Sequence, residues 1–132
     1  MTKNTKVNAA ILIIGNEILS GRTQDTNTST LAIWLNSIGV KVSEVRVIPD
    51  DEKIIVDTLN ILRKENSYVF TTGGIGPTHD DITASSVSKA FNLKYEIHEE
   101  AFKILEEYYQ PGDFNEGRQK MVWMPKNAEL II

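Results

Sequence analysis

The chain contains no cysteine, which excludes disulfide bonds and cysteine-ligated zinc sites. This absence fits the reducing cytoplasm, the location we expect for the protein. A block of basic residues is missing too: 14 basic residues face 18 acidic ones, and the net charge is −4. We therefore expect no nucleic-acid partner, because binding to the phosphate backbone needs clustered positive charge.

Long apolar runs are also absent. The longest run, residues 9–14, is far too short to cross a bilayer, and residues 1–8 are polar and lack the apolar core of a signal peptide. No membrane partner is expected. The 132 residues, 41% hydrophobic and 24% charged, have the size and composition of one globular domain.

Short apolar segments alternate with segments of helical spacing, which predicts an α/β fold. Strands are predicted at residues 9–14, 40–48, 68–72, 94–97 (a short edge strand) and 128–132. Helices are predicted at residues 25–38, 50–62, 80–91, 99–110 and 116–124. This order indicates βαβ units and a mostly parallel sheet. Trp34 and Phe91 fall on apolar helical stripes and are expected in the core.

Three stretches leave the ends of predicted strands, and each carries carboxylates. They are residues 15–17, 49–51 and 72–81. The carboxyl ends of parallel strands meet at one edge of a sheet, where open α/β proteins bind their ligands. The three stretches are therefore expected to converge on one cleft.

The longest stretch belongs to the segment FTTGGIGPTHDDIT, residues 70–83, which combines glycines with two aspartates. Its glycines let a ligand approach the main chain, and their N–H groups can bind an anion together with the start of the next helix. Threonines at positions 71, 72 and 78 add hydroxyl donors. The segment lacks the ending of a Walker loop and the third glycine of a dinucleotide fingerprint.

The segment holds no lysine or arginine, so Asp80 and Asp81 would repel a phosphate. A divalent cation resolves the conflict, because Mg²⁺ prefers one or two carboxylates together with phosphate oxygens. The alternative is that both aspartates cap the following helix, as Asp51 and either Asp25 or Thr26 are expected to do. Both interpretations stay open.

Several other side chains have a functional and a structural interpretation. His79 is a general acid, a metal ligand or a solvent-facing loop residue. Two arginines are either phosphate contacts or solvated, namely Arg22 and Arg118. Three aromatic residues could stack on a purine or pterin ring, although packing is their expected role: Tyr108, Tyr109 and Trp123.

Three motifs resemble the molybdopterin-binding domain family, from about residue 8 to the end of the chain. They are TTGGIGPTHDDIT (71–83), GNEILSGRTQDTN (15–27) and VIPDD (47–51). The second motif is similar to the competence/damage-inducible, CinA-like branch rather than to the dedicated molybdenum-cofactor enzymes. Ile75 departs from the threonine typical of cofactor-synthesis members, and His79 departs from a proline frequent in the CinA-like pattern.

The resemblance implies a three-layer α/β/α sandwich with a mixed, mostly parallel sheet. It implies one domain over residues 1–132, which a longer chain would continue past Ile132, and a homo-oligomer, either a dimer or a trimer. CinA-like members resemble pyrophosphatases that act on ADP-ribose-like nucleotides with a divalent metal, Mg²⁺, Mn²⁺ or Co²⁺. Cofactor-synthesis members bind molybdopterin in molybdenum cofactor biosynthesis, which implies instead a non-catalytic pterin-phosphate module. A third hypothesis is an oligomeric scaffold whose site has lost its function.

Through these motifs, the resemblance implies roles for individual residues. Asp81 and Asp50 match the acidic positions expected to be catalytic and to bind the metal, and Asp80 is a further expected metal ligand. Glu17 and Asp25 match acidic positions of the CinA-like branch. The expected ligand and phosphate contacts are Gly15, Glu17, Thr72, Gly73, Gly74, Gly76, Thr78 and Thr83.

Overall fold

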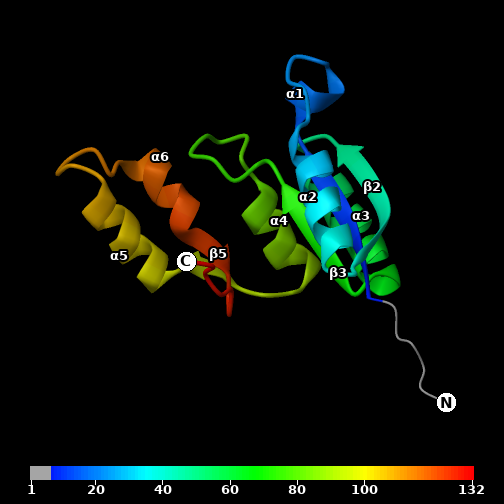
Figure 1. Ribbon diagram of the computed structural model, residues 1–132. Coiled ribbons are helices and arrows are strands. Elements are labelled where there is room, and N and C mark those ends of the chain that lie inside the picture. The colour runs from blue at the N-terminus through cyan, green and yellow to red at the C-terminus, as the bar shows by residue number, and fades with distance from the viewer. Residues whose placement is uncertain (1–6) are drawn as a thin grey trace.

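A computed structural model describes residues 7–132 and shows helices and strands in alternation (Figure 1). The absence of a signal peptide was inferred from residues 1–8, and residues 1–6 of that segment lie outside the described residues. Within residues 7–132, no helix has both the length and the apolar character that a membrane span requires.

The strands are β1 (Asn8–Ile14), β2 (Lys41–Ile48), β3 (Tyr68–Thr72), β4 (Tyr95–Ile97) and β5 (Trp123–Pro125). The helices are α1 (Asn16–Leu19), α2 (Asn27–Ser37), α3 (Glu52–Glu65), α4 (Thr83–Ala90), α5 (Glu99–Tyr108) and α6 (Glu116–Gln119), with a 3₁₀ turn η1 (Lys120–Val122).

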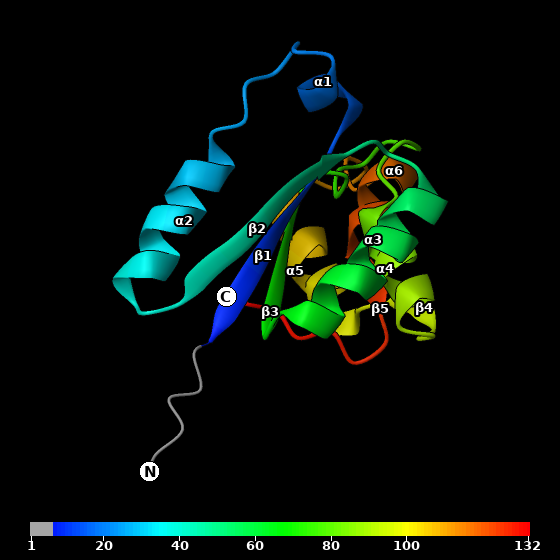
Figure 2. The ribbon, with the colours of Figure 1, turned by 90° about the vertical axis from the view of Figure 1, so that its right-hand side faces the viewer.

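The main sheet has three strands in the order β2-β1-β3, and both pairings are parallel. Helix α2 lies on one side of this sheet, and α3 and α4 lie on the other (Figure 2). β1 is the central strand and is buried on both faces, which explains its unbroken apolar sequence. The predicted α/β class and parallel sheet are confirmed.

The core is built on one face of β1. Ala10, Leu12 and Ile14 alternate along the strand and pack with residues of β2 and α3, namely Ile48, Ile55 and Leu62. The strand period of two residues and the helical period bring these side chains into one layer. Each fully buried isoleucine or leucine contributes about 1.5–3 kcal/mol to folding. The core therefore fixes the edge from which the three loops leave.

A second, antiparallel sheet holds β4 and β5. The strand predicted at residues 94–97 exists, but it belongs to this sheet rather than to the edge of the main one. The strand predicted at residues 128–132 is wrong, and residues 123–125 form a strand instead, which overlaps the end of the helix predicted at residues 116–124. Residues 123–125 lie opposite β4, whereas Ile131 and Ile132 are fully exposed.

Two predicted core residues lie at the surface. Trp34 is 54% exposed because α2 contacts mainly the edge strand β2 and buries Leu35 alone. Phe91 is 41% exposed, and the guanidinium of Arg63 lies 4.2 Å from its ring centroid. Helical spacing identified the apolar stripes, but how much of each stripe the sheet covers depends on where the helix sits.

The structure tests the expected caps at three helices. Asp51 accepts a hydrogen bond from the backbone N–H of Ile54, and Asp25 accepts one from the N–H of Asn27. Helix α4 begins at Thr83, two residues after Asp81, and its start has no side-chain cap. Asp81 turns its carboxylate back toward the preceding loop instead, which frees it from a capping role.

Gly73 allows the loop after β3 to approach β1 closely. It has a φ of +90°, and a Cβ at this position would lie 2.0 Å from the carbonyl oxygen of Ile14. Any side chain here would both strain the backbone and collide with the central strand. The absence of a side chain at Gly73 therefore sets where the loop leaves the sheet.

We predict that Gly73→Ala lowers the free energy of unfolding by about 2–5 kcal/mol, as the sum of left-handed strain and overpacking. Gly39→Ala is the matched control, since Gly39 has a φ of +83° but nothing within 4 Å of its added Cβ. The control should lose about 1–2 kcal/mol from strain alone. Urea unfolding of both variants measures the difference, and equal losses would contradict the proposed collision.

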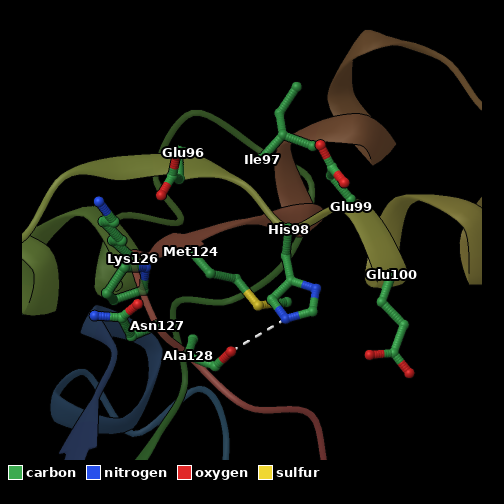
Figure 3. A pocket seen from close by; sticks show the side chains of 10 residues that line it. Glu96, Ile97, His98, Glu99, Glu100, Met124, Lys126, Asn127 and Ala128 are labelled. Carbon is green, nitrogen blue, oxygen red and sulfur yellow. Dashed lines mark hydrogen bonds between the residues drawn. The ribbon is translucent and has the colours of Figure 1, made fainter.

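His98 connects the segment around Ala128 to the start of α5 through hydrogen bonds. Its Nδ1 accepts a hydrogen bond from the N–H of Ala101 at 3.2 Å, and its Nε2 lies 3.1 Å from the carbonyl oxygen of Ala128. The adjoining cavity of about 450 Å³ is also lined by Glu96 and Glu100, whose side chains lie on opposite sides of the ring (Figure 3). Both ring nitrogens are used in structure, so we assign this histidine a structural role.

We predict that His98→Ala lowers the free energy of unfolding by about 1–2 kcal/mol, because the start of α5 loses its cap and Ala128 loses its partner. His98→Asn should recover part of the loss, because asparagine also caps helices. His79→Ala is the control: its side chain is 94% exposed, and a change within about 0.5 kcal/mol is expected. Unfolding curves in urea measure the stability of all three variants. An unchanged free energy of unfolding for His98→Ala would contradict the structural role of His98.

Candidate functional site

The turns after β1 and β2 are joined by a reciprocal pair of hydrogen bonds. The N–H of Asn16 donates to Oδ2 of Asp50 at 3.2 Å, and the N–H of Asp50 donates to Oδ1 of Asn16 at 3.3 Å. Asn16 was not among the predicted site residues, although it lies two residues after the end of β1, in the predicted stretch 15–17. The pair fixes the Asp50 carboxylate at the carboxyl edge of the sheet.

Both candidate acidic residues lie against the glycine loop that follows β3. A Cβ on Gly74 would lie 3.5 Å from Oδ1 of Asp50, and a Cβ on Gly76 would lie 2.8 Å from Oδ2 of Asp81. The structure therefore brings the loops after all three strands of the main sheet to one place. Asp50 and Asp81 approach positions two residues apart on the same loop.

The Asp81 carboxylate is held in its charged form. Partial burial opposes the charge, but the hydroxyl and N–H of Thr78, the N–H of Gly76 and the ammonium of Lys120 favour it, so the pKa of Asp81 lies below its usual range. The two Thr78 bonds measure 2.8 and 2.9 Å. A carboxylate has about four lone-pair sites, so these contacts leave capacity for a cation.

Lys120 supplies the positive charge that the loop sequence lacks. It lies in the η1 turn, donates a hydrogen bond from Nζ to the carbonyl oxygen of Thr78, and acts on Asp81 through its charge. Sequence analysis missed this residue, because it is 42 positions from Thr78 and no local motif marks it. The folded loop thus has both signs of charge beside it.

The remaining loop residues form its frame. Thr83 is buried and donates from its hydroxyl to the carbonyl oxygen of Gly73 at 2.8 Å, while its N–H donates to the carbonyl oxygen of Gly74 at 3.0 Å. Two carbonyl oxygens that would repel a phosphate are therefore turned inward. Thr83, a predicted ligand contact, therefore stabilises the conformation of the loop through these two hydrogen bonds.

The other predicted positions lie on the β1 side of the loop. Thr72 and Gly73 line a cavity of about 210 Å³ together with Glu17 and Asp25. Gly15 is buried, and a Cβ on it would lie 2.6 Å from a carboxylate oxygen of Glu17. The carboxylate of Asp25, one residue before the N-cap position of α2, accepts hydrogen bonds from the N–H groups of Asn27 and Thr28 and is therefore already used in structure.

Asp80 lies apart from this arrangement. Its carboxylate is exposed and 3.2 Å from the ring of His79. Among residues 7–132, no cluster of three or more histidine, cysteine, aspartate or glutamate side chains could hold a metal ion. A cation at the loop would therefore need the two carboxylates Asp50 and Asp81 together with oxygens of its ligand.

The two arginines considered from the sequence have structural partners instead. Arg22 donates to the hydroxyl of Ser20. Arg118 donates to the carbonyl oxygen of Asp113 and lies 4.5 Å from the ring centroid of Tyr109. Tyr109 also stacks on Phe114, with ring centroids 5.9 Å apart, and its neighbour Tyr108 is exposed.

A cavity of about 230 Å³ opens beside the loop. Its lining includes Gly74, Gly76, Asp81, Lys120 and Trp123. Main-chain groups, a carboxylate and an ammonium group thus face one space. This combination suits a phosphorylated ligand whose charge is shared between a lysine and a cation.

Comparison with known proteins agrees with this geometry. A family profile described as "Probable molybdopterin binding domain" matches residues 10–128. A CinA-like protein of Citrifermentans bemidjiense is 36% identical over 124 residues, which cover 92% of this chain and 30% of the relative. A protein of Sulfurisphaera tokodaii is 40% identical over 123 residues, covering 91% of this chain and 47% of the relative.

Solved structures show the same likeness. The crystal structure of the protein CinA, of unknown function, from Thermoplasma acidophilum superposes with a TM-score of 0.84 at 32% identity, covering 90% of this chain and 70% of that one. The tungsten cofactor synthesizing protein MoaB from Pyrococcus furiosus has a TM-score of 0.61 at 21% identity, covering 89% and 69%, and shows the shared fold.

The chain spans about half the length of most of the curated relatives that it matches, and less of the CinA-like protein. The family profile nevertheless covers the three strands of the main sheet and the glycine loop between β3 and α4. On the profile match, the shared fold and the CinA relatives together, the chain belongs to the molybdopterin-binding domain family, in its CinA-like branch.

Proposed function

We propose that the protein binds the phosphate groups of a nucleotide at the glycine loop and cleaves an ADP-ribose-like substrate as a divalent-metal-dependent pyrophosphatase. The observation that carries this proposal is the approach of two carboxylates, Asp50 and Asp81, to the same stretch of loop, residues 74–76. The main-chain N–H groups of the glycines and the hydroxyl of Thr72 are the proposed phosphate contacts, whereas Thr78, expected from the sequence to contact phosphate, donates its hydroxyl proton to Asp81. We also propose that the protein acts in the cytoplasm, as expected from the sequence.

The residues present fit a hard divalent cation, Mg²⁺, Mn²⁺ or Co²⁺. Such cations often bind through one or two protein carboxylates and complete their shell with phosphate oxygens and water. Asp50 and Asp81 would hold the ion, whereas Asp80, which was also expected as a ligand, is exposed and pairs with His79. When bound, the ion would neutralise the diphosphate and act as a Lewis acid.

The chain's own groups have separate tasks in this proposal. Asn16 orients the Asp50 carboxylate, and Thr78 and Lys120 keep that of Asp81 ionised. Thr83 turns the loop carbonyls away from the ligand. Preorganised polar groups of this kind stabilise charge that develops in a transition state without having to reorient.

A second candidate is a molybdopterin-binding module without turnover, active in molybdenum cofactor biosynthesis. Two observations favour it. The family description refers to binding, and the described residues contain no preformed cluster of three metal ligands. The same loop would then hold a pterin phosphate. A homo-oligomer, a dimer or a trimer, is expected in either case, and sedimentation velocity measures it.

We predict that the protein releases AMP from ADP-ribose or FAD when Mg²⁺, Mn²⁺ or Co²⁺ is added, and that chelation of the metal stops the release. Asp81→Asn and Asp50→Asn should each reduce the rate by about 100-fold or more, because each removes a charge fixed at the reacting phosphates. Asp57→Asn is the matched control: Asp57 pairs with Lys53 on the surface of α3 and should leave the rate unchanged. Chromatographic detection of AMP measures the rates.

The outcomes separate the hypotheses. Metal-dependent AMP release that survives both substitutions would remove Asp50 and Asp81 from the mechanism. If no AMP appears and a pterin phosphate raises the melting temperature, the binding module is supported, because a ligand that binds the folded state alone stabilises it. If neither nucleotide nor pterin changes the melting temperature, the scaffold hypothesis stands instead.

A further inference from the structure

Two cavities meet beside the glycine loop. The smaller, of about 230 Å³, contains the loop and Asp81, and the larger, of about 710 Å³, lies on the other side of Lys120 and Trp123. Both residues line both cavities. Lys120 and Trp123 are thus a boundary that the two cavities share, and a ligand that spans both cavities has to cross these two side chains.

The larger cavity has an aromatic wall, formed by Tyr95 and Trp123. In the antiparallel register, Trp123 pairs with Ile97 and Pro125 pairs with Tyr95, so Tyr95 and Trp123 are diagonal neighbours on one face of the small sheet. Their ring centroids are 5.5 Å apart, and the rings are inclined by 42°. The two strands thus set two aromatic rings side by side at the cavity.

This aromatic wall is only partly used for packing. Trp123 remains 37% exposed, whereas Val122 beside it is fully buried. Tyr95 is more covered, and this burial raises the pKa of its phenol above the usual range. A partly exposed indole beside a half-buried second ring is the kind of surface on which planar heteroaromatic rings stack.

Lys120 stands between the aromatic wall and the loop. Its ammonium contacts the carbonyl oxygen of Thr78 and lowers the pKa of Asp81 through its charge. The same turn, η1, therefore supplies a cation near the phosphate end of the site and leads directly into Trp123. No other segment described in residues 7–132 lines both cavities with a cationic and an aromatic side chain.

We propose that the aromatic wall, Tyr95 and Trp123, binds the planar heteroaromatic ring of the ligand whose diphosphate lies at the glycine loop, with Lys120 contacting that diphosphate. This proposal rests on the proposed function, since it needs phosphate binding at the loop. The ring is an adenine or a pterin, which present the same flat face to the indole. Trp123 is then the residue that makes a ringed ligand bind more tightly than a bare diphosphate.

The test uses single-tryptophan protein, made by Trp34→Phe, so that fluorescence reports Trp123 alone. Three probes are titrated with Mg²⁺ present: ADP, 6-hydroxymethylpterin diphosphate and inorganic pyrophosphate, the last followed by calorimetry. Both probes that carry a ring should quench the fluorescence of Trp123, and the probe that binds with the higher affinity identifies the preferred ring. Pyrophosphate has no ring and serves as the matched control.

In the calorimetric titration, Trp123→Leu should weaken the preferred ringed probe by about tenfold or more, the loss of one stacked ring, and should change pyrophosphate affinity by less than about twofold. Trp123→Phe keeps a flat face and should retain most of the affinity. Lys120→Met should weaken the ringed probe and pyrophosphate alike. Unchanged pyrophosphate binding also shows that each Trp123 variant is folded.

Each result decides between the two proposals. If pyrophosphate and the ringed probe bind the unsubstituted protein equally well, or Trp123→Leu weakens both by the same factor, the aromatic wall is overturned and phosphate binding at the loop stands. If neither pyrophosphate nor a ringed probe binds, the proposed function itself fails. A ring preference lost in Trp123→Leu and kept in Trp123→Phe supports the inference.

Discussion

The contact between the Gly73 backbone and the carbonyl of Ile14 sets the geometry on which the site depends. It lets the loop after β3 turn back over the end of the central strand. From there, Thr83 can bond to the loop carbonyls, and Asp50 and Asp81 can reach Gly74 and Gly76 from either side. These glycines therefore have a structural cause besides their proposed role in ligand binding: each leaves room for a neighbouring oxygen atom.

The site also balances opposite charges drawn from distant parts of the chain. Its two carboxylates follow strands of the main sheet, whereas Lys120 comes from the turn that precedes the small sheet. Hydrogen bonds from Thr78 and the charge of Lys120 outweigh the cost of partly burying Asp81. Neither the loop alone nor the small sheet alone would present this mixture of charges to a ligand.

Sequence patterns predicted what depends on local and periodic chemistry. The apolar run of β1, the strand at residues 68–72 and the cap at Asp51 all follow from such rules. The patterns failed where a distant partner decides the outcome. Lys120 is matched to Thr78 by tertiary packing, β5 forms because β4 lies opposite it, and Trp34 is exposed because α2 sits over an edge strand. Capping by Asp81, one of the two interpretations left open, is wrong, because an aspartate before a helix satisfies the pattern of a cap even when its bonds go to the loop.

The parallel arrangement of the main sheet has a consequence for how the protein opens. Asn16, Asp50 and Gly74 come together only when β1 is paired with both β2 and β3, so no form with part of the sheet opened retains the complete proposed phosphate site. Occupancy of the site is therefore coupled to cooperative opening of the whole sheet. Amide hydrogens of β1 should exchange with solvent more slowly in a ligand-saturated sample, while those of α5, which lies outside this sheet, keep their rates.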